Sequence, residues 1–161
     1  MSRLVGSEMP DELFELMTGK GKGGRAGRVV VMATVDDKGW AHPAMVSYYE
    51  LVAKERGLIN LAIGRNSTTE RNLERTGAIT LVVTDHRVNF YLKGAARKIR
   101  EQIEKTPFSL FQVKLETVLE DQDPAATIVQ GIKYEWDQSS KAEHMQAMLD
   151  RVSKVLEETP I

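Results

Sequence analysis

The sequence contains no cysteine among its 161 residues. This excludes disulfide bonds, thiolate metal sites and a cysteine nucleophile, and it suits a reducing compartment. The longest apolar run, Val29 to Ala33, is far shorter than the roughly 20 residues that a membrane-spanning helix needs. The first residues carry acidic side chains and lack the continuous apolar core of a signal peptide. We therefore expect a cytoplasmic protein that does not enter a membrane.

The chain also lacks an excess of charge of either sign. It has 22 basic and 23 acidic side chains, for a formal net charge of −1. No overall field favours nucleic acid or an anionic membrane as a partner. An anionic ligand would therefore have to be held by local geometry.

Several common functional motifs are absent or stand in the wrong context. Gly19, Gly21 and Gly24 form a G-x-G-x-x-G pattern, but a helical segment precedes it and a strand follows it, the reverse of a dinucleotide fingerprint. Its composition is typical of a flexible linker. The three histidines show no metal-ligand spacing, so no metal site is expected. No G-x-S-x-G nucleophile elbow is present.

The pattern of apolar residues predicts about six strands in antiparallel succession. Asp36 to Gly39 has the composition of a hairpin turn, and Pro43 in the second strand indicates a bulge or an edge position. Only the third strand is followed by a convincing helix, so a barrel or sandwich is favoured over a doubly wound fold. Residues 93–105 read equally as an extension of the fifth strand or as a helix. The predicted strands are residues 28–35, 40–51, 58–63, 78–84, 88–92 and 108–119.

Helices are predicted mainly at the two ends of the chain. Residues 7–17 form the first, with Pro10 in its first turn, and residues 67–75 form a short one that begins with the capping pair Ser67 and Glu70. A brief helical segment is expected over residues 123–130. A second capping pair, Ser140 and Glu143, opens an amphipathic C-terminal helix. We expect one domain over residues 1–161: helix and glycine-rich connector (1–27), barrel (28–136) and C-terminal helix (139–158).

The start of the helix at 67–75 has the features of a phosphate site. The first N–H groups of a helix have no intrahelical partner and carry partial positive charge. Three hydroxyl residues, Ser67, Thr68 and Thr69, stand there in a row, flanked by Arg65 and Arg71. Capping alone would explain Ser67 but not the two threonines, which are mediocre helix formers. The pattern is compatible with phosphate binding, and a capping Ser67 with solvent-exposed threonines is the alternative.

Three stretches together resemble the FMN-binding split-barrel superfamily, which includes pyridoxamine 5′-phosphate oxidase and small FMN-binding proteins. They are VVVMATVDDKGWAHPAMVSYY, INLAIGRNSTTERNLERTGAITLVV and FYLKGAA, within about residues 29–96. The resemblance lies in their order and spacing. It implies a mainly β fold: an antiparallel six-stranded Greek-key split β-barrel with peripheral helices and a C-terminal amphipathic helix.

The resemblance also implies a ligand and an assembly. The ligand is FMN, and the protein is a homodimer with each flavin at the subunit interface. Because a reduced flavin carries negative charge near N1 and the C2 carbonyl, Lys93 on a strand of the same sheet is a candidate cation there, and a solvated lysine at a strand end is the alternative. Members often carry a lysine or arginine inside the phosphate turn, where this chain has Thr68. The implied phosphate contacts are Ser67, Thr68, Thr69, Asn72, Arg65 and Arg71, and the implied ring contacts are Met45, Val46, Ser47 and Tyr48.

These features predict a flavoprotein, and several functions remain open. The chain could be a flavin-dependent oxidoreductase acting on a small molecule, or an FMN carrier or electron-transfer protein without a substrate. The same barrel could instead hold haem or a deazaflavin. Pyridoxamine 5′-phosphate oxidase itself ends in an arginine-containing segment that helps to bind substrate. This sequence has DRVSKVLEETPI in its last helix, so we do not expect vitamin B6 oxidation.

Overall fold

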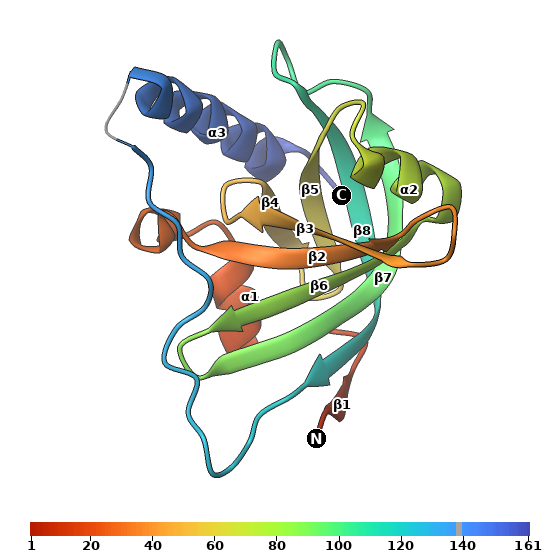
Figure 1. Cartoon of the computed structure of the whole chain (residues 1–161), viewed down its shortest axis with the longest axis vertical. Helices are drawn as coiled ribbons and strands as arrows, with labels where there is room; N and C mark the ends of the chain where they lie inside the picture. The colour runs from red at the N-terminus through yellow and green to blue at the C-terminus, as the bar shows by residue number, and fades with distance from the viewer. Residues whose placement is uncertain (138–139) are drawn as a thin grey trace.

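A computed structural model describes residues 1–137 and 140–161 and shows one curled antiparallel sheet with helices around it (Figure 1). The strands follow the order β3-β2-β6-β7-β8-β5-β4, and β1 pairs with the far end of β8. The ordered path ends at β3 and at β4, so the barrel is split between these two strands. The strands are β1 (Arg3–Gly6), β2 (Val29–Val35), β3 (Ala41–Ser47), β4 (Leu51–Glu55), β5 (Leu58–Gly64), β6 (Ala78–Asp85), β7 (Val88–Arg100) and β8 (Phe108–Glu120).

Three α-helices cover different parts of this sheet. They are α1 (Asp11–Met17), α2 (Thr68–Thr76) and α3 (Ser140–Glu158). Leu13 and Met17 of α1 are buried in the main core inside the barrel. Helix α2 packs near the β2–β3 hairpin, whereas α3 lies on the outside, against β4 and β5 (Figure 1). No helix within the described ranges is both long enough and apolar enough to cross a membrane.

Strand β5 is apolar at nearly every position because both of its faces are buried, and Asn60 is its one polar side chain. Ile59, Leu61 and Ile63 belong to the core inside the barrel. Ala62, on the opposite face, belongs to a second cluster formed with α3. Successive side chains of a strand point to opposite faces, so an unbroken apolar run needs a partner on each side. Asn60 on the outer face donates from Nδ2 to the carbonyl of Leu156 at 3.0 Å, which fixes α3 to the sheet.

The mainly β, antiparallel split-barrel architecture predicted from the sequence is confirmed, including the β2–β3 hairpin. The Asp36 carboxylate accepts hydrogen bonds from the amides of Lys38 and Trp40, and Gly39 has a φ of +83°. Pro43 lies on β3, the edge strand at one end of the sheet, where a missing N–H costs no ladder bond. The region left open at 93–100 is strand, as the long continuation of β7.

The number of strands differs from the prediction because two strands were not recognised. The predicted strand 40–51 ends at Ser47, and β4 begins at Leu51, the last residue of that predicted strand. The Glu50 side chain bonds back to Ser47 and reverses the chain there, although most residues between 44 and 53 are apolar. Strand β1 is short and exposed, and it is held mainly by pairing with β8.

Three predictions for the connecting segments were wrong. Helix α1 begins at Asp11 rather than at residue 7, because Pro10 occupies the N-cap position. The segment 123–130 contains only a turn, in which the Asp123 side chain accepts from the amide of Ala125. The glycine-rich connector forms a 3₁₀ turn over Lys22–Arg25, where Arg25 donates to the carbonyl of Leu16 at 2.7 Å. These outcomes depend on contacts that composition does not reveal.

The predicted C-terminal helix is confirmed as α3 from Ser140 to Glu158. Its expected first residue, 139, and the side chain of the capping Ser140 lie outside the described residues.

Candidate cofactor site

The turn before α2 is tightly organised by its own side chains. The Ser67 hydroxyl accepts a hydrogen bond from the Glu70 amide at 3.0 Å, as the capping pattern predicts. The Glu70 carboxylate reaches one residue further than the usual capping box and accepts from the Asn66 amide at 2.6 Å. Asn66 is a non-glycine residue with a φ of +60°, a conformation that asparagine tolerates better than most residues. The turn is therefore held in a single shape.

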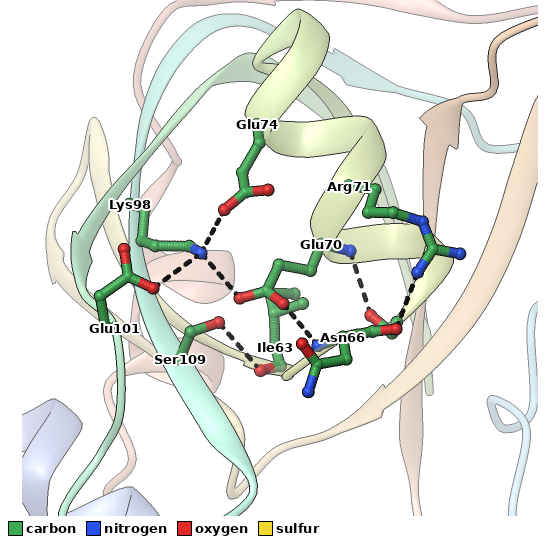
Figure 2. A network of polar contacts seen from close by, with 9 residues as sticks. Ile63, Asn66, Glu70, Arg71, Glu74, Lys98, Glu101 and Ser109 are labelled. Atoms are coloured by element: carbon green, nitrogen blue, oxygen red, sulfur yellow. Dashed lines mark hydrogen bonds and ion pairs between the residues drawn. The ribbon is translucent and has the colours of Figure 1, made fainter.

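A cluster of charges anchors this turn to β7 (Figure 2). The Lys98 ammonium lies 2.9 Å from the Glu70 carboxylate and also pairs with Glu74 and Glu101. Burial raises the pKa of Glu70, but its bonds with Lys98 and with the Asn66 amide outweigh this and hold the pKa below its usual value. Lys98 is thus surrounded by carboxylates, and its role is to dock α2 rather than to receive an anion.

The groups left for an anion lie on the outer side of the same turn. The amides of Thr68 and Thr69 belong to the first helical turn, where no carbonyl of the helix is available to them. The exposed guanidinium of Arg71 donates to the Asn66 carbonyl at 2.8 Å and to the Thr68 hydroxyl at 3.0 Å, so it is held across the turn. Arg65 is exposed beside it. These charges and amides can bind a phosphate group.

Two of the predicted phosphate ligands point inward instead. Thr69 and Asn72 are both buried. The Asn72 side chain donates to the Thr34 hydroxyl at 3.0 Å and thereby joins α2 to β2. The structure therefore gathers all six predicted residues at one helix start, but Asn72 has a structural bond there and Thr69 offers its amide more readily than its side chain.

A separate pocket of about 490 Å³ opens beside helix α3. Pockets of roughly 300–1,000 Å³ are typical for small organic ligands and cofactors. Its wall comes from β2, β3, the start of β8, the strap 132–136 and helix α3. It is lined mainly by apolar and aromatic side chains, namely Val29, Met45, Ser47, Glu50, Phe108, Ile132, Lys133, Tyr134, Trp136, Met145 and Leu149.

The pocket and the turn are connected through β5 and β8. Phe108, a lining residue, pairs with Gly64 at the end of β5, immediately before the turn. The Arg65 amide donates to the Pro107 carbonyl at 2.9 Å. These contacts place one wall of the pocket beside the residues that lead into the turn.

Only half of the expected ring contacts line this pocket. Met45 and Ser47 line it, whereas Val46 belongs to the core on the opposite face of β3 and Tyr48, just after the strand, is also buried in that core. Burial raises the pKa of Tyr48 to about 12, and the nearby Asp85 carboxylate acts in the same direction. Contact of all four residues with one ring stays a prediction.

Lys93 and some of the aromatic side chains lie elsewhere. Lys93 is exposed on β7, opposite Thr80 and Thr117, and the described pocket lining does not include it. Trp40 is exposed at the hairpin, and the Tyr91 hydroxyl donates to Asp121. Of the two tryptophans, Trp136 lines the pocket.

The strap 132–136 brings that side chain to the pocket. It is attached by the Val29 amide, which donates to the Ile132 carbonyl at 3.2 Å. Tyr134 and Trp136 then meet edge to face at 5.2 Å between ring centroids.

Glu50 is the functional candidate that the sequence reasoning missed. Its Oε2 atom accepts hydrogen bonds from both the amide and the hydroxyl of Ser47, each at 2.7 Å. Burial raises its pKa, and the two bonds from Ser47 only partly counteract this. The S-x-x-E spacing of Ser47 and Glu50 was an available signal, because the same spacing marks a chain reversal at Ser67 and Glu70.

Comparison with known proteins identifies the family of this chain. A family model described as pyridoxamine 5′-phosphate oxidase matches residues 25–135. The chain belongs to this family, and the resemblance expected from the sequence is confirmed. A relative from Bacillus subtilis (strain 168), the uncharacterized protein YclD, is 29% identical over 133 residues, covering 78% of this chain and 82% of that protein.

Solved structures agree on the fold at low sequence identity. A Lactobacillus delbrueckii protein, whose name places it with the same oxidases, has a TM-score of 0.59 at 16% identity, covering 73% of this chain and 98% of that one. An FMN-binding protein from Syntrophomonas wolfei has a TM-score of 0.51 at 15% identity, covering 70% and 89%. Together they show that the chain shares the fold of these proteins.

Proposed function

We propose that this protein binds FMN and acts as a flavin-dependent oxidoreductase on a small organic molecule. The isoalloxazine ring would occupy the pocket beside Met45 and Trp136, and the phosphate would bind at the turn before α2. The observation that carries the proposal is an apolar pocket of about 490 Å³ whose lining residue Phe108 pairs with Gly64, just before a turn that presents first-turn amides and two arginines. The family of the chain and a similar FMN-binding structure support it.

The donor groups suit a phosphate ester. Arg71 is already oriented by two hydrogen bonds, so little side-chain entropy would be lost when it binds an anion. The amides of Thr68 and Thr69 would supply further donors, and Arg65 a second charge. Arg71 would thus supply the charge that relatives place inside the turn, where this chain has Thr68.

The chemistry would come from the flavin, which exchanges electrons in pairs or singly. The chain would contribute binding, orientation and exclusion of water. Phe108, Trp136 and Met145 supply the apolar wall of the pocket, and Glu50 supplies an acidic group at its edge. A carrier without a substrate is the alternative that the same site allows.

We also propose a homodimer with the flavin at its interface. Trp40 and Met45 expose 71% and 64% of their surface around the edge strand β3, and Ile132 exposes 51% on the adjacent strap. Exposed apolar side chains grouped on one region favour a protein interface. Met45 and Ile132 also line the pocket, so a second copy placed there would cover a bound ring.

The test compares the binding of FMN with that of riboflavin, which lacks the phosphate. Flavin fluorescence quenching is expected to give a dissociation constant for FMN at least tenfold lower, because charge-assisted hydrogen bonds are worth about 1.5–3 kcal/mol each. Equal dissociation constants for FMN and riboflavin would show that the phosphate does not bind at the turn. A Soret band from the purified protein would show that the ligand is haem, and a deazaflavin spectrum would show that it is a deazaflavin, instead of FMN.

Turnover separates an enzyme from a carrier. The reconstituted protein is expected to oxidise NADH or NADPH in the presence of an acceptor from a panel of quinones, nitroaromatics and other small electrophiles. A protein that binds FMN but shows no turnover across that panel would be a carrier instead.

A further inference from the structure

Glu50 stands out because it is a carboxylate in a pocket whose walls are otherwise largely apolar. It lies in the tight reversal between β3 and β4, and its position is fixed on both sides. The Glu50 amide donates to the Ser47 carbonyl at 3.0 Å, and the Glu50 carbonyl accepts from the Ala62 amide at 2.8 Å. The backbone therefore holds this residue at the rim of the pocket, between the edge strand and β5.

The two carboxylate oxygens of Glu50 differ in their hydrogen bonds. Oε2 receives both bonds from Ser47, one from the amide and one from the hydroxyl. The Ser47 hydroxyl has only one proton, so it has no second one to donate to a ligand. Oε1 remains the acceptor of Glu50 that is available to an occupant of the pocket.

The other polar groups of the pocket are less suited to this task. Lys133 is more than half exposed and lies 3.9 Å from the Glu135 carboxylate. Tyr134 contacts Trp136 edge to face and has a pKa raised by burial and by the Glu50 charge. Glu50 itself is largely buried, and among the residues that the structure describes its donors are those of Ser47 to Oε2. A donor on the ligand would restore the missing interaction.

We propose that Glu50 accepts a hydrogen bond from a ring N–H of the bound ligand and thereby determines how the ring lies in the pocket. The inference rests on the proposed function, under which the ring is the isoalloxazine and the donor is its imide group, N3–H. The ligand class is a planar heteroaromatic compound with an N–H donor at its edge. Glu50 is a positioning and specificity residue in this proposal and transfers no proton.

The Glu50→Gln variant suits the test because it preserves the turn. The amide oxygen of glutamine can accept both bonds from Ser47, which leaves an NH₂ group where Oε1 was. The variant thus replaces an acceptor by a donor at the pocket without removing atoms. Glu55→Gln on β4 is the matched control, since Glu55 is an exposed carboxylate outside this pocket.

The experiment measures dissociation constants of FMN and 3-methyl-FMN, in which a methyl group replaces the N3 proton. The parent protein is expected to bind FMN tenfold to a hundredfold more tightly than 3-methyl-FMN, on the order of one charge-assisted hydrogen bond. Glu50→Gln is expected to weaken FMN binding by a similar factor and to abolish the preference. Glu55→Gln is expected to behave like the parent.

A second readout is the reduction potential of the bound flavin at saturating FMN. Removal of a negative charge beside the ring favours the reduced flavin, so Glu50→Gln is expected to raise the potential and Glu55→Gln to leave it unchanged. If the parent binds both flavins equally, the role of Glu50 is wrong while FMN binding stands. If neither flavin binds at all, the proposed function fails as well. If Glu50→Gln does not fold, the dissociation constants of FMN and 3-methyl-FMN for the parent protein still distinguish these two outcomes.

Discussion

At the scale of single residues, the proposed phosphate site at the turn before α2 depends on Arg65 and Arg71. Arg71 bridges the turn through Asn66 and Thr68, and Arg65 lies beside it in solvent. Arg71→Ala is expected to raise the dissociation constant of FMN about tenfold or more and to leave riboflavin binding almost unchanged. Fluorescence titration with the two flavins measures this difference.

Arg87→Ala is the control for that variant, because it removes an exposed guanidinium from the β6–β7 turn instead. A loss of FMN affinity in Arg87→Ala equal to that in Arg71→Ala would mean that only overall charge matters. Arg65→Ala should show an intermediate loss, since no bond in the free protein orients its side chain among the described contacts.

Gly94 is required by a close approach of two strands. The ladder between β7 and β8 shifts register between Lys93 and Gly94, and a Cβ atom on Gly94 would lie 2.3 Å from the Lys114 carbonyl oxygen. Gly94→Ala is expected to lower the free energy of unfolding by about 3 kcal/mol, because backbone must move to admit the methyl group. Urea denaturation measures the change.

Gly64→Ala provides the comparison, since a Cβ atom there would meet nothing within 4 Å. It is expected to leave the unfolding midpoint nearly unchanged. Equal effects of the two substitutions would show that the β7–β8 contact does not limit residue size at position 94.

At the scale of elements, the docking of α2 on β7 depends on charge. Lys98 and Glu70 expose only 14% and 8% of their side chains, so each would be costly to leave without its partner. Lys98→Met is expected to reduce the free energy of unfolding by about 1–3 kcal/mol. Denaturant unfolding at neutral pH measures it, and an unchanged midpoint would mean that apolar contacts alone hold α2.

The same cluster predicts an acid dependence of stability. The folded protein holds the pKa of Glu70 below its ordinary value of 4.5. A carboxyl with a lowered pKa stabilises the fold above its unfolded pKa, and the contribution is lost as the pH falls through the lower folded value. Unfolding curves between pH 7 and pH 3 should therefore show a steeper loss below about pH 4.5 in the parent than in Glu70→Gln.

Glu74→Gln serves as the control for that series, because Glu74 pairs with the same lysine but is half exposed. It should retain most of the acid dependence of the parent. An identical acid profile for the parent and Glu70→Gln would contradict the assignment to Glu70.

At the scale of the whole molecule, the apolar residues around β3 predict self-association. Sedimentation velocity with bound FMN is expected to show a species of twice the mass of one chain. Met45→Glu should shift the protein toward monomer and weaken FMN binding, because it places a charge on both the interface and the pocket. Leu4→Glu, on the equally exposed strand β1, should remain dimeric.

The sequence determined those features that are encoded within a few neighbouring residues. The β2–β3 hairpin follows from Asp36 and Gly39, and the start of α2 follows from Ser67 and Glu70. The strand pattern of β5 and β8 was also predictable, because burial imposes a period of two or a continuous apolar run. The sequence also placed the candidate phosphate-binding residues together at the start of one helix, because they are neighbours in the chain.

The tertiary structure alone decided which side chains meet in the pocket. Glu50, Phe108 and Trp136 come from three distant segments, and only the curl of the sheet and the attachment of the strap bring them together. It also decided that Lys98 neutralises Glu70 and that Tyr48 faces the core. A local pattern fixes how the backbone bends, but long-range packing determines which face of a strand is buried and which charges become partners.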